Sequence, residues 1–136
     1  MCRLRSAWRP GRGPRGDVRV VVADAAAHVR SALRLVLEQH TGVSCAAELT
    51  TGDRLLTELG RASAGVHIVD WQLPNLDLAR ELPILRQAYP RLRVVVLSSR
   101  PEDRHSVLAA GADAFVSKGD APEAQFTILW DRGGGR

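Results

Sequence analysis

The sequence has little of the material from which covalent, metal-linked or membrane-embedded frameworks are built. Its 136 residues include only two cysteines, Cys2 and Cys45, which is too few for a disulfide or zinc framework and fits a reducing cytoplasm. No apolar run approaches the roughly 20 residues that cross a bilayer. We therefore expect one cytoplasmic domain without membrane contact, long enough to bury a single hydrophobic core.

Lysine is almost absent, and arginine carries nearly all of the positive charge. Lys118 is the only lysine, and the net charge of the chain is +4. Five arginines and no acid lie within residues 1–16: Arg3, Arg5, Arg9, Arg12 and Arg15. Subtracting these five charges from +4 leaves −1, so the remainder is nearly neutral. Clustered arginines bind nucleic-acid phosphates, so any nucleic-acid contact is expected through this segment alone.

Two terminal segments differ in composition from a folded domain. Residues 1–16 mix arginine with glycine and proline and lack the apolar block of a signal peptide, which predicts a disordered basic leader. Residues 131–136 consist mostly of glycine and arginine and predict a flexible tail. Residues 17–130 are expected to form the folded domain.

Apolar runs alternate with amphipathic segments in residues 17–130. Strands are predicted at 18–24, 43–47, 66–69, 93–97 and 114–116. Helices are predicted to include residues 29–37, 55–59, 78–85, 102–110 and 120–130. Pro83 falls inside the third helix and predicts a kink or a split there. Strands that are apolar throughout are typical of a covered parallel sheet, so we expect a doubly wound α/β domain with five parallel strands and helices on both faces.

Polar side chains follow four of these strands at the point where each strand ends. They are Asp24, Asp70, Ser98 and Lys118, after the first, third, fourth and fifth strands. Each has an ordinary structural explanation when taken singly, such as a turn-capping aspartate or a solvated lysine. The carboxyl ends of parallel strands share one edge of the sheet, however, and that edge carries the ligand crevice in open α/β folds. The set therefore predicts a functional site at this edge.

Four segments that end predicted strands resemble the receiver domains of bacterial two-component response regulators. They are residues 18–24 (VRVVVAD), 70–75 (DWQLPN), 97–99 (LSS) and 109–118 (AAGADAFVSK). The resemblance covers residues 17–130 and implies a flavodoxin-like fold. Lys118 is followed by Gly119, where many receivers have proline. A residue other than proline at this position resembles the receivers that are joined to LuxR-type helix-turn-helix domains. No such output domain follows in this chain, so an isolated receiver or a piece of a longer regulator is expected.

The resemblance implies a signalling module, not an enzyme, in which Asp70 accepts a phosphoryl group from a histidine kinase or a phosphotransfer protein. A transferring phosphoryl group carries spread negative charge, so its acceptor site needs aligned cations and hydrogen-bond donors. The family positions assign the ammonium to Lys118 and the hydroxyl to Ser98. Ser98 and Phe115 match the pair of switch residues, in which movement of the hydroxyl toward the phosphoryl group lets the ring turn inward.

The resemblance also implies a Mg²⁺ site. Its ligands by motif position are the carboxylates of Asp24 and Asp70 and the backbone carbonyl of Gln72. The family usually has two adjacent acids after the first strand, whereas this chain has Asp24 and Ala25. Mg²⁺ is commonly held by one or two carboxylates, so the loss of an acid at Ala25 is expected to weaken metal binding.

Two other hypotheses remain open at this stage. A pseudo-receiver would act as an interaction domain without phosphorylation, through a face formed by the fourth helix, the fifth strand and the fifth helix. The same face is expected to contact an output protein if Asp70 is phosphorylated, and homodimer formation stays open. A haloacid-dehalogenase-type phosphatase would need a second aspartate at position 72, which is Gln72 here.

Overall fold

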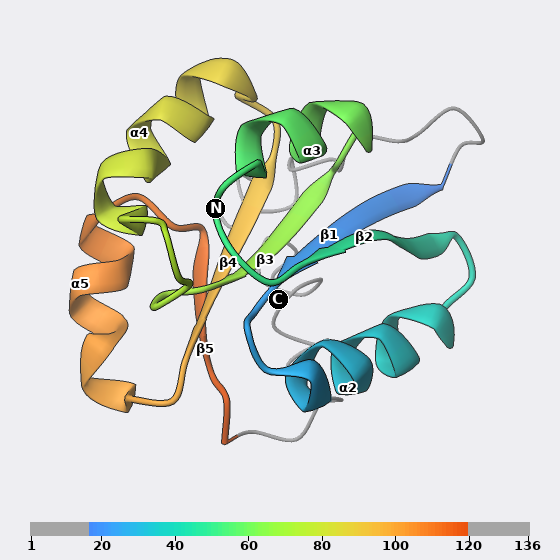
Figure 1. Ribbon diagram of the computed structural model, residues 1–136, viewed down its shortest axis with the longest axis horizontal. Coiled ribbons are helices and arrows are strands. Elements are labelled where there is room, and N and C mark those ends of the chain that lie inside the picture. Colours follow the sequence, from blue (N-terminus) through green and yellow to red (C-terminus); the bar gives the residue numbers. More distant parts are fainter. Residues whose placement is uncertain (1–16, 120–136) are drawn as a thin grey trace, which may run out of the picture.

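The computed structural model describes residues 17–119, and its core is a single sheet of five parallel strands. The strands are β1 (Val18–Ala23), β2 (Val43–Leu49), β3 (Val66–Asp70), β4 (Arg93–Ser98) and β5 (Ala114–Ser117). Their order across the sheet is β2-β1-β3-β4-β5, so the winding direction reverses between β1 and β3 (Figure 1). This is the flavodoxin-like order, and the predicted fold class is confirmed.

Helices cover both faces of the sheet. They are α2 (Ala27–Glu38), α3 (Leu55–Arg61), α4 (Leu78–Ala88) and α5 (Arg104–Ala109), the last preceded by a 3-10 turn, η1 (Pro101–Asp103). The apolar core has two parts. One joins α2 to one face, and the other joins α3, α4 and α5 to the opposite face (Figure 1). The predicted helix at 120–130, the leader and the tail lie outside the described residues.

The strands are apolar along their whole length because both of their faces are buried. In β1, Val20 and Val22 pack toward α2, whereas Val21 and Ala23 pack toward α3 and α4. All four are fully buried. Burying one valine or leucine side chain contributes roughly 1.5–3 kcal/mol, so the two-sided core is the main stabilising term of the fold.

Three sequence predictions need correction. The first strand ends at Ala23, one residue before Asp24. The helix predicted at 102–110 begins as the η1 turn, and its α-helical part is only Arg104–Ala109. The predicted split at Pro83 is wrong, because α4 runs unbroken with Pro83 exposed while Leu82 and Leu85 anchor the helix on the sheet. The predicted kink stays a prediction.

The amino-terminal edge of the sheet holds a polar network that is separate from the predicted site. Arg86 on α4 donates from Nη1 to the Leu92 carbonyl at 2.7 Å and from Nη2 to the Gly111 carbonyl at 3.0 Å, and it pairs with Asp113. The Asp113 carboxylate also accepts a hydrogen bond from the Val94 amide at 2.7 Å. The network therefore ties α4 to the starts of β4 and β5.

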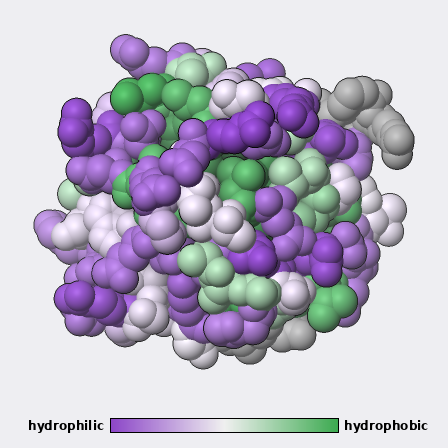
Figure 2. All heavy atoms as spheres, viewed as in Figure 1, coloured by the Kyte–Doolittle hydropathy of each residue, from purple (hydrophilic) through white to green (hydrophobic). Residues whose placement is uncertain are grey.

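The exposed large apolar side chains of the described residues are distributed over all four α-helices. The large apolar side chains that are exposed lie one on each helix: Leu35 on α2, Leu56 on α3, Ile84 on α4 and Leu108 on α5. Figure 2 shows small apolar areas separated by hydrophilic residues on the face in view. Within residues 17–119, no helix is both long enough and apolar enough to cross a bilayer.

Candidate functional site

Backbone pairing places Asp24, Asp70 and Lys118 at the carboxyl edge of the sheet. Asp70 is the last residue of β3, while Asp24 and Lys118 directly follow β1 and β5. The Asp24 amide donates to the Leu49 carbonyl at 3.0 Å, and the Lys118 amide donates to the Ser98 carbonyl at 2.9 Å. These bonds continue the strand pairing past the strand ends, so the sheet itself fixes where the three side chains begin.

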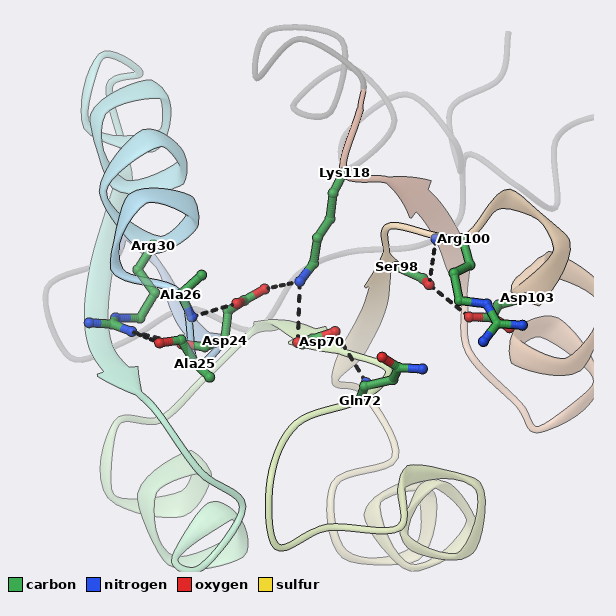
Figure 3. Close-up of polar contacts among 10 residues, drawn as sticks. All are labelled: Asp24, Ala25, Ala26, Arg30, Asp70, Gln72, Ser98, Arg100, Asp103 and Lys118. Carbon is green, nitrogen blue, oxygen red and sulfur yellow. Dashed lines mark hydrogen bonds and ion pairs between the residues drawn. The ribbon is translucent and has the colours of Figure 1, made fainter.

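The Lys118 ammonium lies between the two carboxylates (Figure 3). Its Nζ is 2.7 Å from Asp24 Oδ2 and 3.2 Å from Asp70 Oδ2. Burial by itself lowers the pKa of Lys118, but the hydrogen bond to Asp24 and the charges of both carboxylates outweigh it, so the pKa is raised above the ordinary value. The three groups carry a net charge of about −1 when all are ionised.

Each carboxylate uses its other oxygen to shape the turn that follows it. Asp24 Oδ1 accepts the Ala26 amide at 2.9 Å, and Asp70 Oδ1 accepts the Gln72 amide at 3.1 Å. Each carboxylate therefore caps a turn with one oxygen and contacts Lys118 with the other. The turns hold Asp24 Oδ2 and Asp70 Oδ2 toward the lysine.

No carboxylate is available at position 25, where Ala25 is exposed. The neighbouring guanidinium of Arg30 donates from Nη1 to the carbonyls of Asp24 at 2.8 Å and Ala25 at 3.3 Å. Its Nε pairs with Glu48 at 3.2 Å, and Figure 3 shows it directed away from Asp70. Arg30 thus fixes the backbone of this turn, and the edge beside β1 supplies one acid only.

Ser98 lies at the same edge, but its hydroxyl is bonded elsewhere. Ser98 Oγ donates to Asp103 Oδ2 at 2.8 Å and accepts the Arg100 amide at 3.0 Å. The side chain is buried, and Figure 3 shows its hydroxyl directed toward Asp103 and not toward Asp70. Of the four predicted groups, the structure brings three into contact and leaves the Ser98 hydroxyl outside that contact.

Phe115 is buried in β5, in the core that faces α3, α4 and α5. The guanidinium carbon of Arg104 lies 5.9 Å from the centre of its ring, within the range of a cation–π contact. Sequence reasoning did not find Asp103 or Arg104 as partners of Ser98 and Phe115. An acid five residues after a serine is no recognised motif, and only the η1 turn brings the two side chains together.

The oxygen donors at this edge fit a hard divalent cation. Asp24 Oδ2 is buried, and the Lys118 ammonium is its one partner among residues 17–119. Carboxylate oxygens are ligands that Mg²⁺ takes, and Asp24 and Asp70 supply them, whereas the role of the Gln72 backbone carbonyl stays a prediction. No group of three or more His, Cys, Asp or Glu side chains suited to a metal occurs in the described part of the chain. The fit therefore rests on the two acids, Asp24 and Asp70.

Comparison with known sequences identifies the pattern as that of a response regulator receiver domain, whose family profile matches residues 20–128. A protein-glutamate methylesterase/protein-glutamine glutaminase of Rhodospirillum centenum is 30% identical over 120 residues, which cover 80% of this chain and 30% of that protein. The uncharacterized transcriptional regulatory protein YhcZ of Bacillus subtilis is 26% identical over 108 residues, covering 78% of this chain and 50% of YhcZ. The chain thus spans half or less of the length of these relatives.

Solved structures with the same fold include two response regulators. The RcsB response regulator of Salmonella typhimurium superposes with a TM-score of 0.78 at 24% identity, covering 89% of this chain and 62% of RcsB. The signal receiver domain of NarL from Mycobacterium tuberculosis superposes with a TM-score of 0.77 at 24% identity, covering 88% of this chain and 98% of that domain. These likenesses establish a shared fold.

Proposed function

Because this chain belongs to the response regulator receiver family of two-component systems, we propose that it accepts a phosphoryl group on Asp70. The observation that carries the proposal is the position of Lys118. Its ammonium joins Asp70 on β3 to Asp24 beside β1, although the three residues are far apart in the sequence. An acceptor carboxylate next to a fixed cation suits phosphoryl transfer, and a second acid nearby can help to hold a metal ion.

The proposed step transfers a phosphoryl group from a phosphohistidine of a histidine kinase or phosphotransfer protein. Asp70 Oδ2 attacks phosphorus, and the phosphorus–nitrogen bond breaks with its electron pair passing to the imidazole nitrogen. The product is an acyl phosphate on Asp70 and a free histidine on the donor. The Lys118 ammonium, 3.2 Å from Asp70 Oδ2, would hold a phosphoryl oxygen, and the Ser98 hydroxyl would donate to another after leaving its present partner.

Asp24, Asp70 and the backbone carbonyl of Gln72 would hold Mg²⁺. When bound there, the cation supplies positive charge that offsets the phosphoryl oxygens. Because Ala25 brings no carboxylate, we propose that this chain binds Mg²⁺ more weakly than a receiver with two adjacent acids after β1. Lys118 supplies the only positive charge that touches both acids within residues 17–119.

The same observations favour one alternative, a pseudo-receiver that binds its partner without phosphorylation. Lys118 already offsets part of the charge of Asp24 and Asp70, and the acid missing at Ala25 makes the site less dependent on a metal. In either case we propose a cytoplasmic domain of residues 17–130. Its output contact would lie on the face that includes α5 and β5.

Labelling with a small phosphodonor tests the proposal. The protein is incubated with acetyl phosphate and Mg²⁺, then read by intact mass and phosphate-affinity gel mobility. We expect one added phosphoryl group in the wild type and none in Asp70→Asn. Asp77→Asn serves as the matched control, because Asp77 is an exposed acid in the loop that follows β3 and makes no side-chain cap to α4.

The outcomes separate the two candidates. Label that survives Asp70→Asn contradicts the assignment of the acceptor. Absence of label in the wild type and in both variants, across a range of Mg²⁺ concentrations, supports the pseudo-receiver instead.

A further inference from the structure

Two consecutive residues at the start of α5 hold both of the residues assigned to the switch. Asp103 Oδ2 accepts the hydroxyl hydrogen bond of Ser98 at 2.8 Å. Arg104, the next residue, covers the ring of Phe115 with its guanidinium carbon 5.9 Å from the ring centre. We call this pair, Asp103 and Arg104, the 103–104 clasp. Because its two members are adjacent in the chain, displacement of one residue affects the other.

The hydrogen bonds of Ser98 commit its hydroxyl to this arrangement. A hydroxyl has one proton to donate, and Asp103 takes it, while the Arg100 amide occupies an acceptor position at 3.0 Å. The Ser98 carbonyl is meanwhile bonded to the Lys118 amide at 2.9 Å. The backbone of Ser98 is thus fixed beside the acceptor site, and only its side chain is held away.

The position of Asp103 does not have the usual explanation for an aspartate before a helix. Asp103 is the N-cap residue of α5, yet its side chain makes no capping hydrogen bond to the helix. Arg100, which precedes the η1 turn, pairs with Glu102 at 3.4 Å. The carboxylate of Asp103 is directed to Ser98 instead, so its contact is with the switch and not with the helix it precedes.

We infer that Asp103 is a positioning residue that restrains Ser98 from binding a phosphoryl oxygen on Asp70, and that release of this bond also uncovers Phe115 through Arg104. The inference rests on the proposed function of Asp70. Ser98 must exchange a hydrogen bond to a carboxylate for one to the phosphoryl group, so Asp103 lowers the affinity of the site for a phosphoryl group or its mimic. The 103–104 clasp would set the threshold at which this receiver switches.

The test uses Asp103→Asn in the full chain, with beryllofluoride and Mg²⁺ as the phosphoryl mimic and acetyl phosphate as the donor. We expect Asp103→Asn to bind beryllofluoride at least about threefold more tightly and to keep its phosphoryl label longer, since hydrogen bonds to charged groups are stronger than neutral ones. Glu102→Gln is the matched control, because Glu102 is the neighbouring acid of the same turn and pairs with Arg100 instead of Ser98. It should behave as the wild type does.

A double-mutant cycle distinguishes restraint of Ser98 from a general effect on the fold. In a Ser98→Ala background, Asp103→Asn should change neither beryllofluoride affinity nor label lifetime, because the restrained hydroxyl is gone. Thermal melts of each variant check that it is folded. Phe115 ring signals in NMR spectra should shift in Asp103→Asn and in Arg104→Ala, and not in Glu102→Gln.

Two results would overturn the inference while leaving the proposed function intact. One is that Asp70 is labelled, yet Asp103→Asn binds beryllofluoride no more tightly than the wild type does. The other is a gain that persists in the Ser98→Ala background. If no protein in the series binds label or mimic, the proposed function itself fails, and the inference fails with it.

Discussion

Lys118 determines the charge of the site at the scale of single residues. It is the only lysine of the chain, and its ammonium contacts one carboxylate that is 1% exposed and another at the end of β3. Its raised pKa lies above the ordinary value for lysine, so it stays charged throughout the physiological range. Removing it would leave Asp24 buried without a counter-charge, which is costly to the folded state.

Restoring the missing acid is the residue-scale prediction. Ala25→Asp should tighten Mg²⁺ binding by about tenfold or more, because it adds a carboxylate at the position that we propose to face the metal. The measurement is a Mg²⁺ titration followed by tryptophan emission, in which Trp71 lies beside Asp70 and Trp8 and Trp130 contribute the same background throughout.

Ala27→Asp is the control for added charge, since Ala27 is exposed and begins α2 two residues further on. Equal Mg²⁺ affinity in the wild type, Ala25→Asp and Ala27→Asp would show that position 25 does not face the metal.

The contact of Asp24, Asp70 and Lys118 could be predicted because each follows an apolar strand, and parallel strands end at one edge. The orientation of Ser98 could not be predicted in this way. Its hydroxyl direction depends on one side-chain rotation and on the η1 turn, which place Asp103 within 2.8 Å of it. The end of a strand can be predicted from neighbouring residues in the sequence. The partner of the Ser98 hydroxyl depends on the folded structure and cannot be predicted in that way.

At the scale of elements, α4 contains Pro83 in its interior, where proline is unfavourable for a helix. Pro83 is the sixth residue of the helix, and its side chain is exposed. A proline inside a helix removes one backbone hydrogen bond. The helix persists because buried leucines on its other face hold it against the sheet.

Pro83→Ala should therefore stabilise the protein. We expect a gain of about 1–2 kcal/mol in the free energy of unfolding, since the higher helix propensity of alanine exceeds the entropic advantage of proline in the unfolded chain. Urea denaturation measures it, with Gln87→Ala, an exposed change on the same helix, as the control. A loss of stability in Pro83→Ala would mean that the proline ring shapes α4 in a way that the sheet contacts require.

At the scale of the whole molecule, the stability of the sheet depends on a histidine in its centre. His67 in β3 is fully buried, with Nδ1 donating to the Val21 carbonyl at 3.1 Å and Nε2 without a hydrogen bond in the described part of the chain. Burial lowers its pKa from 6.5 to about 4, so the folded protein keeps it neutral.

The unfolded chain binds a proton on His67 below pH 6.5, whereas the folded protein binds it only near pH 4. The contribution of neutral His67 to the stability of the folded protein is therefore fully present above pH 6.5, and it is lost progressively as the pH falls toward 4. We expect His67 to contribute a loss of about 2 kcal/mol in the free energy of unfolding between pH 7 and pH 5. Urea denaturation at both pH values measures the loss.

Two histidine variants check this assignment. His67→Leu should flatten the dependence on pH between 7 and 5, while His105→Gln, at an exposed histidine, should keep it. An unchanged slope in His67→Leu would assign the effect to other groups.

The fold as a whole was predictable because strand burial on both faces leaves continuous apolar runs in the sequence, as in Val20, Val21 and Val22. Boundaries were less predictable where short-range geometry decides them. The η1 turn depends on the hydrogen bond from the Asp103 amide to the Arg100 carbonyl, and the turn after β1 depends on the bond from the Ala26 amide to Asp24 Oδ1.

Arg86 and Asp113 lie at the end of the strands opposite to Asp70, and their polar network includes none of the residues around Asp70. Substitutions at that end would lower the number of folded molecules in the cell, and each folded molecule would still carry an intact site around Asp70. Raising the amount of protein would therefore restore signalling in a variant of Arg86 or Asp113, whereas it would not restore signalling in a variant of Asp70.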